Sequence, residues 1–290
     1  MTSVPRIDAL RSCPAGRYED GFVVVTHGEA PGITAEPWPG GRIAVRHRLR
    51  AAELDDEIAE PLAAALAPLS DDHEVFARAF TGVVLTSRPD AGAAWEEFYR
   101  NSLGRLGPLA ATGYSEVYRH AAGLLPGTSV ADIGCGFGFL ALHLAAQGTA
   151  VTACDIDPGT TRLLERMAAR LGVPLRVVTG DGGPGRAFEL ASGSVDAAVL
   201  LHVLEHVTED GAAALIGEAT RIARYRVVVA VPYEQRPTRL FGHLRTIDAS
   251  QLRKLGAGSG WDHRVYDLHG GWLVLDRPDR AQIAPIWLAT

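Results

Sequence analysis

The stretch Val130-Ala131-Asp132-Ile133-Gly134-Cys135-Gly136-Phe137-Gly138-Phe139-Leu140 decides the fold of this chain. A run of β-capable residues leads into an aspartate, three glycines follow at alternate positions, and a helix-forming run begins at Leu140. This order predicts a strand, a tight turn and a helix. Because glycine lacks a Cβ atom, the alternate glycines allow a sharp turn and let a ligand approach the backbone at the N-terminus of the helix.

Further strands follow the glycine turn, and several of them end at polar residues. The second predicted strand, 150–154, ends at Asp155, where a carboxylate can accept both ribose hydroxyls of a nucleoside lying across the turn. Later strands are predicted at 175–179, 194–201 and 226–231. The third runs into Gly180-Asp181. This alternation of strands and helices with short links predicts a parallel sheet with right-handed crossovers.

These motifs, in this order, resemble the class I S-adenosylmethionine-dependent methyltransferases over roughly residues 110 to 275. The resemblance implies an α/β fold with a Rossmann-like seven-stranded sheet, mostly parallel with the last strand antiparallel. The terminal segment 264–276 fits the sixth and seventh strands and turns at Gly270-Gly271. The resemblance also implies S-adenosylmethionine as the cofactor. Its contacts are assigned to Asp132, Gly134, Gly136, Gly138, Asp155, Ile156, Asp181, Leu201 and Tyr114.

The cofactor residues receive separate roles from this resemblance. Asp132 and the glycines shape the methionine pocket, Asp155 holds the ribose, and Asp181 holds the adenine amino group. The alternative is a dinucleotide-binding Rossmann fold, whose turn has glycines at its first, third and sixth positions. Here the glycines occupy the first, third and fifth positions. Asp132 would repel a pyrophosphate and suits the positively charged end of S-adenosylmethionine.

Composition restricts the class of partner. The 290 residues include 47% hydrophobic residues and carry a net charge of -6, which predicts a packed core and argues against a nucleic-acid-binding surface. Three cysteines without Cys-x-x-Cys spacing are typical of a reducing compartment. Neither a signal-like N-terminus nor an 18-residue apolar segment occurs. We therefore expect a soluble, cytoplasmic protein that acts on a small molecule and has no nucleic-acid or membrane partners. The sequence does not give the oligomeric state.

Residues 1–108 are predicted to form a small α+β appendage before the methyltransferase domain, 109–290. Strands at 21–26 and 42–47 are expected to pair antiparallel across the Pro- and Gly-rich stretch 28–41. Helical patterns follow at 51–67, 71–84 and 92–105. The last pattern carries Trp95, Phe98 and Tyr99 on one face, which we interpret as core. Such appendages commonly form a substrate-side lid in methyltransferases, and a packing or dimerisation module is the other interpretation.

Methylation of a hydroxyl requires a base or a metal, because an alcohol has a pKa too high to attack unaided. His202, Glu205 and His206 are spaced i, i+3 and i+4 just beyond the fourth strand, so a helix there would point them to one face. His243 follows the fifth strand. This set resembles metal-dependent O-methyltransferases with a Glu-x-x-Glu-His run and a later histidine, such as small-RNA 2′-O-methyltransferases and ubiquinone-pathway enzymes. His202 stands where those enzymes have the first glutamate.

The resemblance implies a divalent metal held by His202, Glu205, His206 and His243. Three imidazoles and one carboxylate suit Zn²⁺, Mn²⁺, Fe²⁺ or Co²⁺ better than Mg²⁺. In the alternative without a metal, His206 or His243 is the general base and Glu205 lines the cleft. The residues assigned to catalysis are Glu205, His206 and His243.

The predicted activity is O-methylation of a small-molecule hydroxyl, with a sugar or oligosaccharide as the first candidate acceptor. The segments Val231-Pro232-Tyr233-Glu234, Gly242-His243-Leu244-Arg245 and 269–274 are similar to sugar O-methyltransferases of the mycofactocin oligosaccharide methyltransferase type. A metal-independent quinone-type or other small-molecule methyltransferase is one alternative. A catalytically silent module that binds S-adenosylmethionine is another.

Overall fold

The computed structural model describes residues 7–13, 16–107, 114–180 and 190–278. The chain divides into two compact units, the first formed by Met1–Gly107 with Thr238–Gly242 and the second by Pro108–Pro237 with His243–Thr290. A five-residue segment of the C-terminal half therefore belongs to the first unit, which the predicted boundary at residue 108 did not anticipate. No helix within the described ranges is both long and apolar enough to span a membrane.

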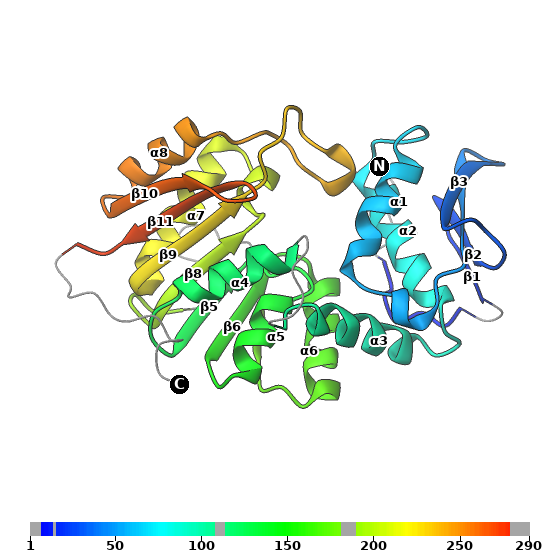
Figure 1. Cartoon of the computed structure of the whole chain (residues 1–290), viewed down its shortest axis with the longest axis horizontal. Coiled ribbons are helices and arrows are strands. Elements are labelled where there is room, and N and C mark those ends of the chain that lie inside the picture. The colour runs from blue at the N-terminus through cyan, green and yellow to red at the C-terminus, as the bar shows by residue number, and fades with distance from the viewer. Residues whose placement is uncertain (1–6, 14–15, 108–113, 181–189, 279–290) are drawn as a thin grey trace. The chain divides into compact units, whose positions relative to one another are not determined.

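A seven-stranded sheet forms the centre of the second unit (Figure 1). Its strands are β5 (Ser129–Ile133), β6 (Ala150–Asp155), β7 (Arg176–Thr179), β8 (Val195–Leu201), β9 (Ala223–Val231), β10 (Asp262–Asp267) and β11 (Gly271–Asp276). They are arranged in the order β10-β11-β9-β8-β5-β6-β7, and β11 is antiparallel to both of its neighbours. The remaining pairings are parallel. This arrangement confirms the predicted Rossmann-like sheet.

Helices cover both faces of this sheet, which explains why its central strands are largely buried and mostly apolar. All seven residues of β8 are buried, as expected for a strand of a parallel sheet with two covered faces. The helices of the unit are α4 (Tyr114–Leu124), α5 (Phe139–Ala146), α6 (Pro158–Leu171), α7 (Glu209–Ile222) and α8 (Ala249–Gly258). In the view of Figure 1, α4 lies in front of the sheet and α7 behind it. Because β5 to β9 run parallel, their carboxyl ends lie at one edge of the sheet, where ligands bind in open α/β sheets.

The described residues of the first unit form a four-stranded sheet, in the order β1-β2-β4-β3, and three α-helices. Its elements are β1 (Arg17–Glu19), β2 (Val23–His27), β3 (Ile33–Trp38), β4 (Arg42–His47), η2 (Ala51–Glu53), η3 (Asp56–Ile58), α1 (Ala59–Leu66), α2 (His73–Thr86) and α3 (Ala91–Gly104). The helical pattern expected over 51–67 thus begins as two 3-10 turns. The aromatic face of α3 is buried, which confirms its interpretation as core.

The expected antiparallel pairing of 21–26 with 42–47 is wrong, because β2 and β4 are parallel. The Pro- and Gly-rich stretch between them contains an additional strand, β3. After β3 the chain reverses at residues 39–41, so that β3 pairs antiparallel with β4. Two reversals of the chain return β4 to the direction of β2. β4 therefore lies between β2 and β3.

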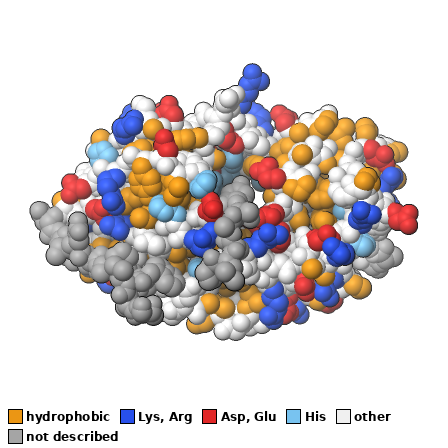
Figure 2. Space-filling model, in the orientation of Figure 1, with side chains coloured by type: hydrophobic (Ala, Val, Ile, Leu, Met, Phe, Trp, Pro, Cys, Tyr) orange, Lys and Arg blue, Asp and Glu red, His pale blue; other side chains and the backbone are white. Residues whose placement is uncertain are grey.

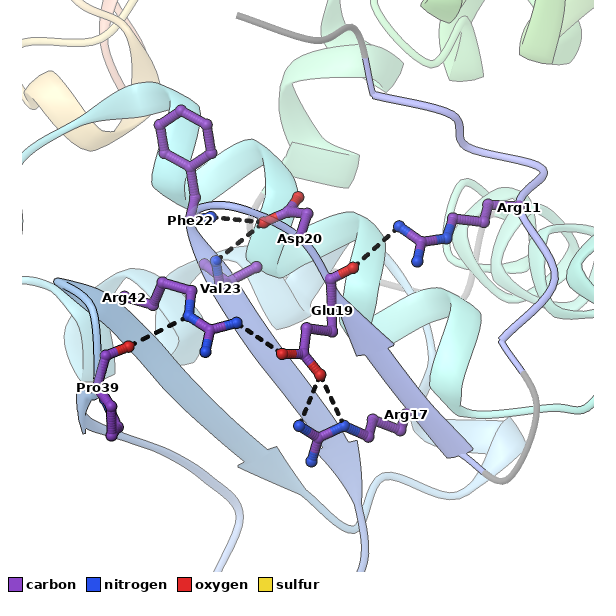
Figure 3. Close-up of polar contacts among 8 residues, drawn as sticks. All are labelled: Arg11, Arg17, Glu19, Asp20, Phe22, Val23, Pro39 and Arg42. Carbon is purple, nitrogen blue, oxygen red and sulfur yellow. Dashed lines mark hydrogen bonds and ion pairs between the residues drawn. The ribbon is translucent and has the colours of Figure 1, made fainter.

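Polar contacts fix the turn between β1 and β2 (Figure 3). Asp20 accepts hydrogen bonds from the backbone N–H groups of Phe22 and Val23, at 2.8 and 2.9 Å. The carboxylate of Glu19 contacts Arg17 at 2.7 Å and Arg42 at 2.6 Å. These charged residues therefore have partners within the sheet and its turns, and we assign them a structural role.

The segment Thr238–Gly242 packs against α2 within the first unit. It includes the 3-10 turn η5 (Arg239–Phe241). His73 Nδ1 lies 2.9 Å from the carbonyl oxygen of Leu240, and the rings of Phe76 and Phe241 meet edge to face with centroids 5.2 Å apart. The chain returns to the second unit at His243, one of the predicted site residues.

Candidate active site

The glycine turn after β5 has the backbone that only glycine adopts without strain. Gly134, Gly136 and Gly138 have φ values of +69°, +52° and +74°, all in the left-handed region. A Cβ atom at Gly134 would lie 2.6 Å from Val203, and one at Gly138 would lie 2.5 Å from Leu164. A Cβ atom at Gly136 would meet no described atom within 4 Å. The outer glycines therefore permit packing, whereas Gly136 faces space in which a ligand can approach the backbone.

Two carboxylates flank this turn. Asp155, at the end of β6, accepts hydrogen bonds from the backbone N–H groups of Gly136 and Asp157, each at 2.9 Å. Asp132 is buried near the end of β5 and accepts a backbone hydrogen bond from Ala141. Burial, followed by the negative charge of Asp155, raises the pKa of Asp132 to about 7. A positively charged ligand would favour the ionised form of Asp132, so this pair suits the ammonium or sulfonium group of a ligand.

Four further residues were predicted to contact the cofactor. Ile156 follows β6 directly and is 69% exposed. Leu201 is the buried last residue of β8. Tyr114 is the first residue of α4, but its side chain lies outside the described structure. Asp181 lies outside the described residues.

A second group of polar side chains lies beyond the carboxyl ends of β8 and β9. One ligand atom each from Glu205, His206 and His243 lies within 4.8 Å of the other two. The His206 and His243 rings meet edge to face with centroids 4.9 Å apart. The carbonyl oxygen of Glu205 accepts a hydrogen bond of 2.8 Å from the N–H of Leu244, which holds His243 beside the 3-10 turn η4 (Leu204–His206).

His202 lies next to this group of three and is not a member of it. The helix expected from its spacing does not form, because only Leu204–His206 makes a single 3-10 turn. His202 instead has a φ of +54°, rare for a residue with a side chain, and its N–H donates to the carbonyl oxygen of Ala230. Its Nδ1 reaches 3.4 Å from Oε1 of Glu205. The structure therefore brings three of the four predicted ligands together and places the fourth in contact with Glu205.

Glu205 is the most constrained member of the group. Its side chain is 1% exposed, and neither carboxylate oxygen has a hydrogen-bond partner among the residues that the structure describes. A buried carboxylate without hydrogen bonds is unfavourable by several kcal/mol, roughly, unless a cation or a proton compensates it. Two imidazoles and one carboxylate form a donor set typical of catalytic zinc and related divalent metals. The residues present therefore fit a metal ion.

Glu234 belongs to this site, although the sequence analysis gave it no role. Its Oε2 lies 2.8 Å from Nδ1 of His243, and the two side chains are 16% and 8% exposed. Metal-binding histidines usually donate their second ring N–H to a carboxylate, which fixes the tautomer and the ring orientation. The sequence feature that could have identified Glu234 is its position, three residues after the end of β9 and nine residues before His243.

Comparisons with known proteins agree with this architecture. Residues 130–225, which include the glycine turn and Glu205, match the family model described as "Methyltransferase domain". An O-methyltransferase family protein from Burkholderia thailandensis has the same fold, with a TM-score of 0.53 and 13% sequence identity. The alignment covers 76% of this chain and 69% of that one. The second unit therefore has the Rossmann-like fold of the class I methyltransferases.

Curated relatives are similar over a shorter stretch. The ubiquinone biosynthesis O-methyltransferase of Methylocella silvestris is 36% identical over 93 residues, which are 31% of this chain and 34% of that protein. The chloroplastic magnesium protoporphyrin IX methyltransferase of Arabidopsis thaliana is 31% identical over 106 residues, 37% of this chain and 33% of that protein. The chain thus spans about a third of the length of the curated relatives it matches.

Proposed function

We propose that this protein is an S-adenosylmethionine-dependent O-methyltransferase that modifies a hydroxyl group of a small molecule. The observation that carries the proposal is the buried carboxylate of Glu205, which lies beside two imidazoles at the strand edge that also carries the glycine turn. The methyl donor would bind at the glycine turn. Glu205, His206 and His243, which we call the Glu205 group, would activate the acceptor. Similarity of residues 130–225 to methyltransferase domains supports the same assignment.

For the methyl donor, the proposal gives a role to each residue around the glycine turn. Asp132 pairs with the positively charged methionine end, and Asp155 accepts the ribose hydroxyls. Gly136 leaves space for the donor to approach the backbone. Ile156 covers one face of the adenine with its exposed side chain.

For the acceptor, Glu205, His206 and His243 would hold a divalent cation, and Glu234 would keep the His243 ring in its orientation. A bound cation would lower the pKa of an acceptor hydroxyl, as metals do for bound water. The hydroxyl proton would pass to solvent if a metal is bound, and to His206 or His243 if none is bound. The acceptor oxygen attacks the methyl carbon in line, so that a carbon–oxygen bond forms as the carbon–sulfur bond breaks and the neutral thioether leaves.

The acceptor that fits this site best has two neighbouring hydroxyls on a ring, and a sugar is our first candidate. The net charge of -6 favours a neutral small molecule over nucleic acid. The second candidate is the phenolic ring of a quinone-type precursor, methylated without a metal, and the name of the Methylocella silvestris relative favours it.

The test is transfer of a radioactive methyl group from S-adenosylmethionine to methyl α-mannopyranoside and to catechol, with calorimetric binding of S-adenosylhomocysteine measured in parallel. Methylation of either ring, lost in His206→Ala and His243→Ala, supports the proposal. Tight binding of S-adenosylhomocysteine without transfer to any acceptor would favour a silent module. Failure to bind S-adenosylhomocysteine better than NAD would remove the proposal altogether.

A further inference from the structure

Three of the four exposed large apolar side chains in the described part of the second unit lie just after the carboxyl ends of strands. The four are Ile156, Tyr233, Leu244 and Leu268. Ile156 follows β6, Tyr233 follows β9 and Leu268 follows β10, three strands that run in the same direction. Glu205 follows β8, a parallel neighbour of β9, so Tyr233 and Glu205 lie at the same edge of the sheet.

Tyr233 differs from the other three because its side chain is fixed in position. Its hydroxyl donates a hydrogen bond of 2.9 Å to Oδ1 of Asp267. Partial burial, followed by this hydrogen bond, raises the pKa of Tyr233 to about 12, so the hydroxyl remains a donor at neutral pH. A Cβ atom at Gly271 would lie 2.7 Å from Cζ of Tyr233, which shows that the ring lies directly over this glycine. Even so, Tyr233 is 41% exposed.

An aromatic ring that is held in place yet exposed is a preorganised surface for stacking. Its place in the chain points to the acceptor, because the next residue, Glu234, contacts His243 of the Glu205 group. Further polar groups lie on the same hairpin, where His269 contacts Glu116 at 2.7 Å. Histidine side chains gather over α4 and the β10–β11 turn in Figure 2, beside apolar side chains.

We propose that Tyr233 is a platform on which the ring of the methyl acceptor stacks, so that its hydroxyls face Glu205, His206 and His243. The proposal rests on the proposed function and adds the recognition of a six-membered ring with an apolar face. Sugars and catechols share this chemistry, since both present an apolar face beside neighbouring hydroxyls, made of C–H bonds in a sugar and of aromatic carbon in a catechol. Tyr233 is a positioning residue, and Asp267 and Gly271 determine where its ring lies.

The experiment measures equilibrium binding of two probes, methyl α-mannopyranoside and catechol, to the full-length protein saturated with S-adenosylhomocysteine. Tyr233→Ala removes the ring and should weaken binding of at least one probe about tenfold, the usual size of an aromatic stacking contribution. Tyr233→Phe keeps the ring and should bind nearly as well as the wild type. Gly271→Ala displaces the ring and should resemble Tyr233→Ala. Leu69→Ala, which removes an exposed apolar side chain of the first unit, is the matched control.

The outcomes separate the platform from the proposed function. Binding of S-adenosylhomocysteine and metal content should be the same in Tyr233→Ala and the wild type, so their loss in every protein would indicate failure of the proposed function itself. A preference for the mannoside or for catechol distinguishes the two sources of the ring. Equal affinity of the wild type and Tyr233→Ala, or no binding of either probe to the wild type, would overturn the platform.

Discussion

Glu234, which is partly buried, and His243, which is buried, form a pair in which the carboxylate Oε2 lies 2.8 Å from the ring Nδ1. The two residues lie on opposite sides of the segment Thr238–Gly242, which belongs to the first unit. The pair therefore closes a loop of eight intervening residues and fixes the orientation of one imidazole beside Glu205 and His206. We therefore expect Glu234 to increase the affinity of Glu205, His206 and His243 for a metal.

Replacement of Glu234 by glutamine should weaken metal binding by about 10- to 100-fold, the usual effect of removing a carboxylate behind a ligating histidine. Competition with a chromogenic chelator measures this change. Glu165→Gln, on the exposed surface of α6, is the matched control and should leave the affinity unchanged. Unaltered metal affinity in Glu234→Gln would show that Glu234 does not support the site.

The pKa of Asp132 makes the stability of the protein depend on pH. Burial raises this pKa from 3.8 to about 7, so the folded protein keeps a proton that the unfolded chain has lost. The folding free energy therefore becomes less favourable as the pH rises from about 4 to about 7. Asp132→Asn removes this penalty and should be more stable than the wild type at pH 8 by roughly 4 kcal/mol at most, with little difference near pH 4.

Urea unfolding at pH 4.5 and pH 8 measures the difference between Asp132→Asn and the wild type. S-adenosylhomocysteine carries a positively charged amino group, so it should bind the wild type more tightly at pH 8 than at pH 6. The variant should lack this dependence. A stability difference that is the same at both pH values would contradict the raised pKa.

Alanine substitutions in the glycine turn should separate packing from ligand approach. Gly136→Ala meets open space, so it should lose stability only through its positive φ, about 1–2 kcal/mol. Gly134→Ala has the same strain and in addition overlaps the stiff side chain of Val203. Thermal unfolding should therefore show the larger loss for Gly134→Ala, while calorimetry should show a marked loss of S-adenosylhomocysteine affinity for Gly136→Ala. Normal affinity in Gly136→Ala would place the donor elsewhere.

The sequence was sufficient to predict the sheet of the second unit because its signals are local. Alternate glycines after a buried strand, and strands ending at Asp155 and Leu201, specify successive βαβ units. The first unit was predicted less well. Pro37 and the surrounding glycines are typical of a loop, so β3 was not predicted, although a strand at the edge of a sheet tolerates proline. Without β3, the parallel pairing of β2 and β4 cannot be deduced.

The candidate site was predicted in part for the same reason. Glu205, His206 and His243 follow two adjacent strands, so their proximity follows from the topology. His202 was assigned by helical spacing, which fails because its backbone turns to a positive φ directly after β8. The contact of Glu234 with His243 and the packing of Leu240 on His73 depend on the course of one loop through both units, which no local pattern indicates.

The most direct test of the central claim is elemental analysis of the full-length protein saturated with S-adenosylhomocysteine, beside a His206→Ala, His243→Ala double variant. Our account predicts about one divalent metal ion per chain in the wild type and none in the variant, because Glu205 alone is too poor a ligand set. Absence of metal from both proteins, with S-adenosylhomocysteine still bound, would contradict the metal site and leave the two histidines as candidate bases.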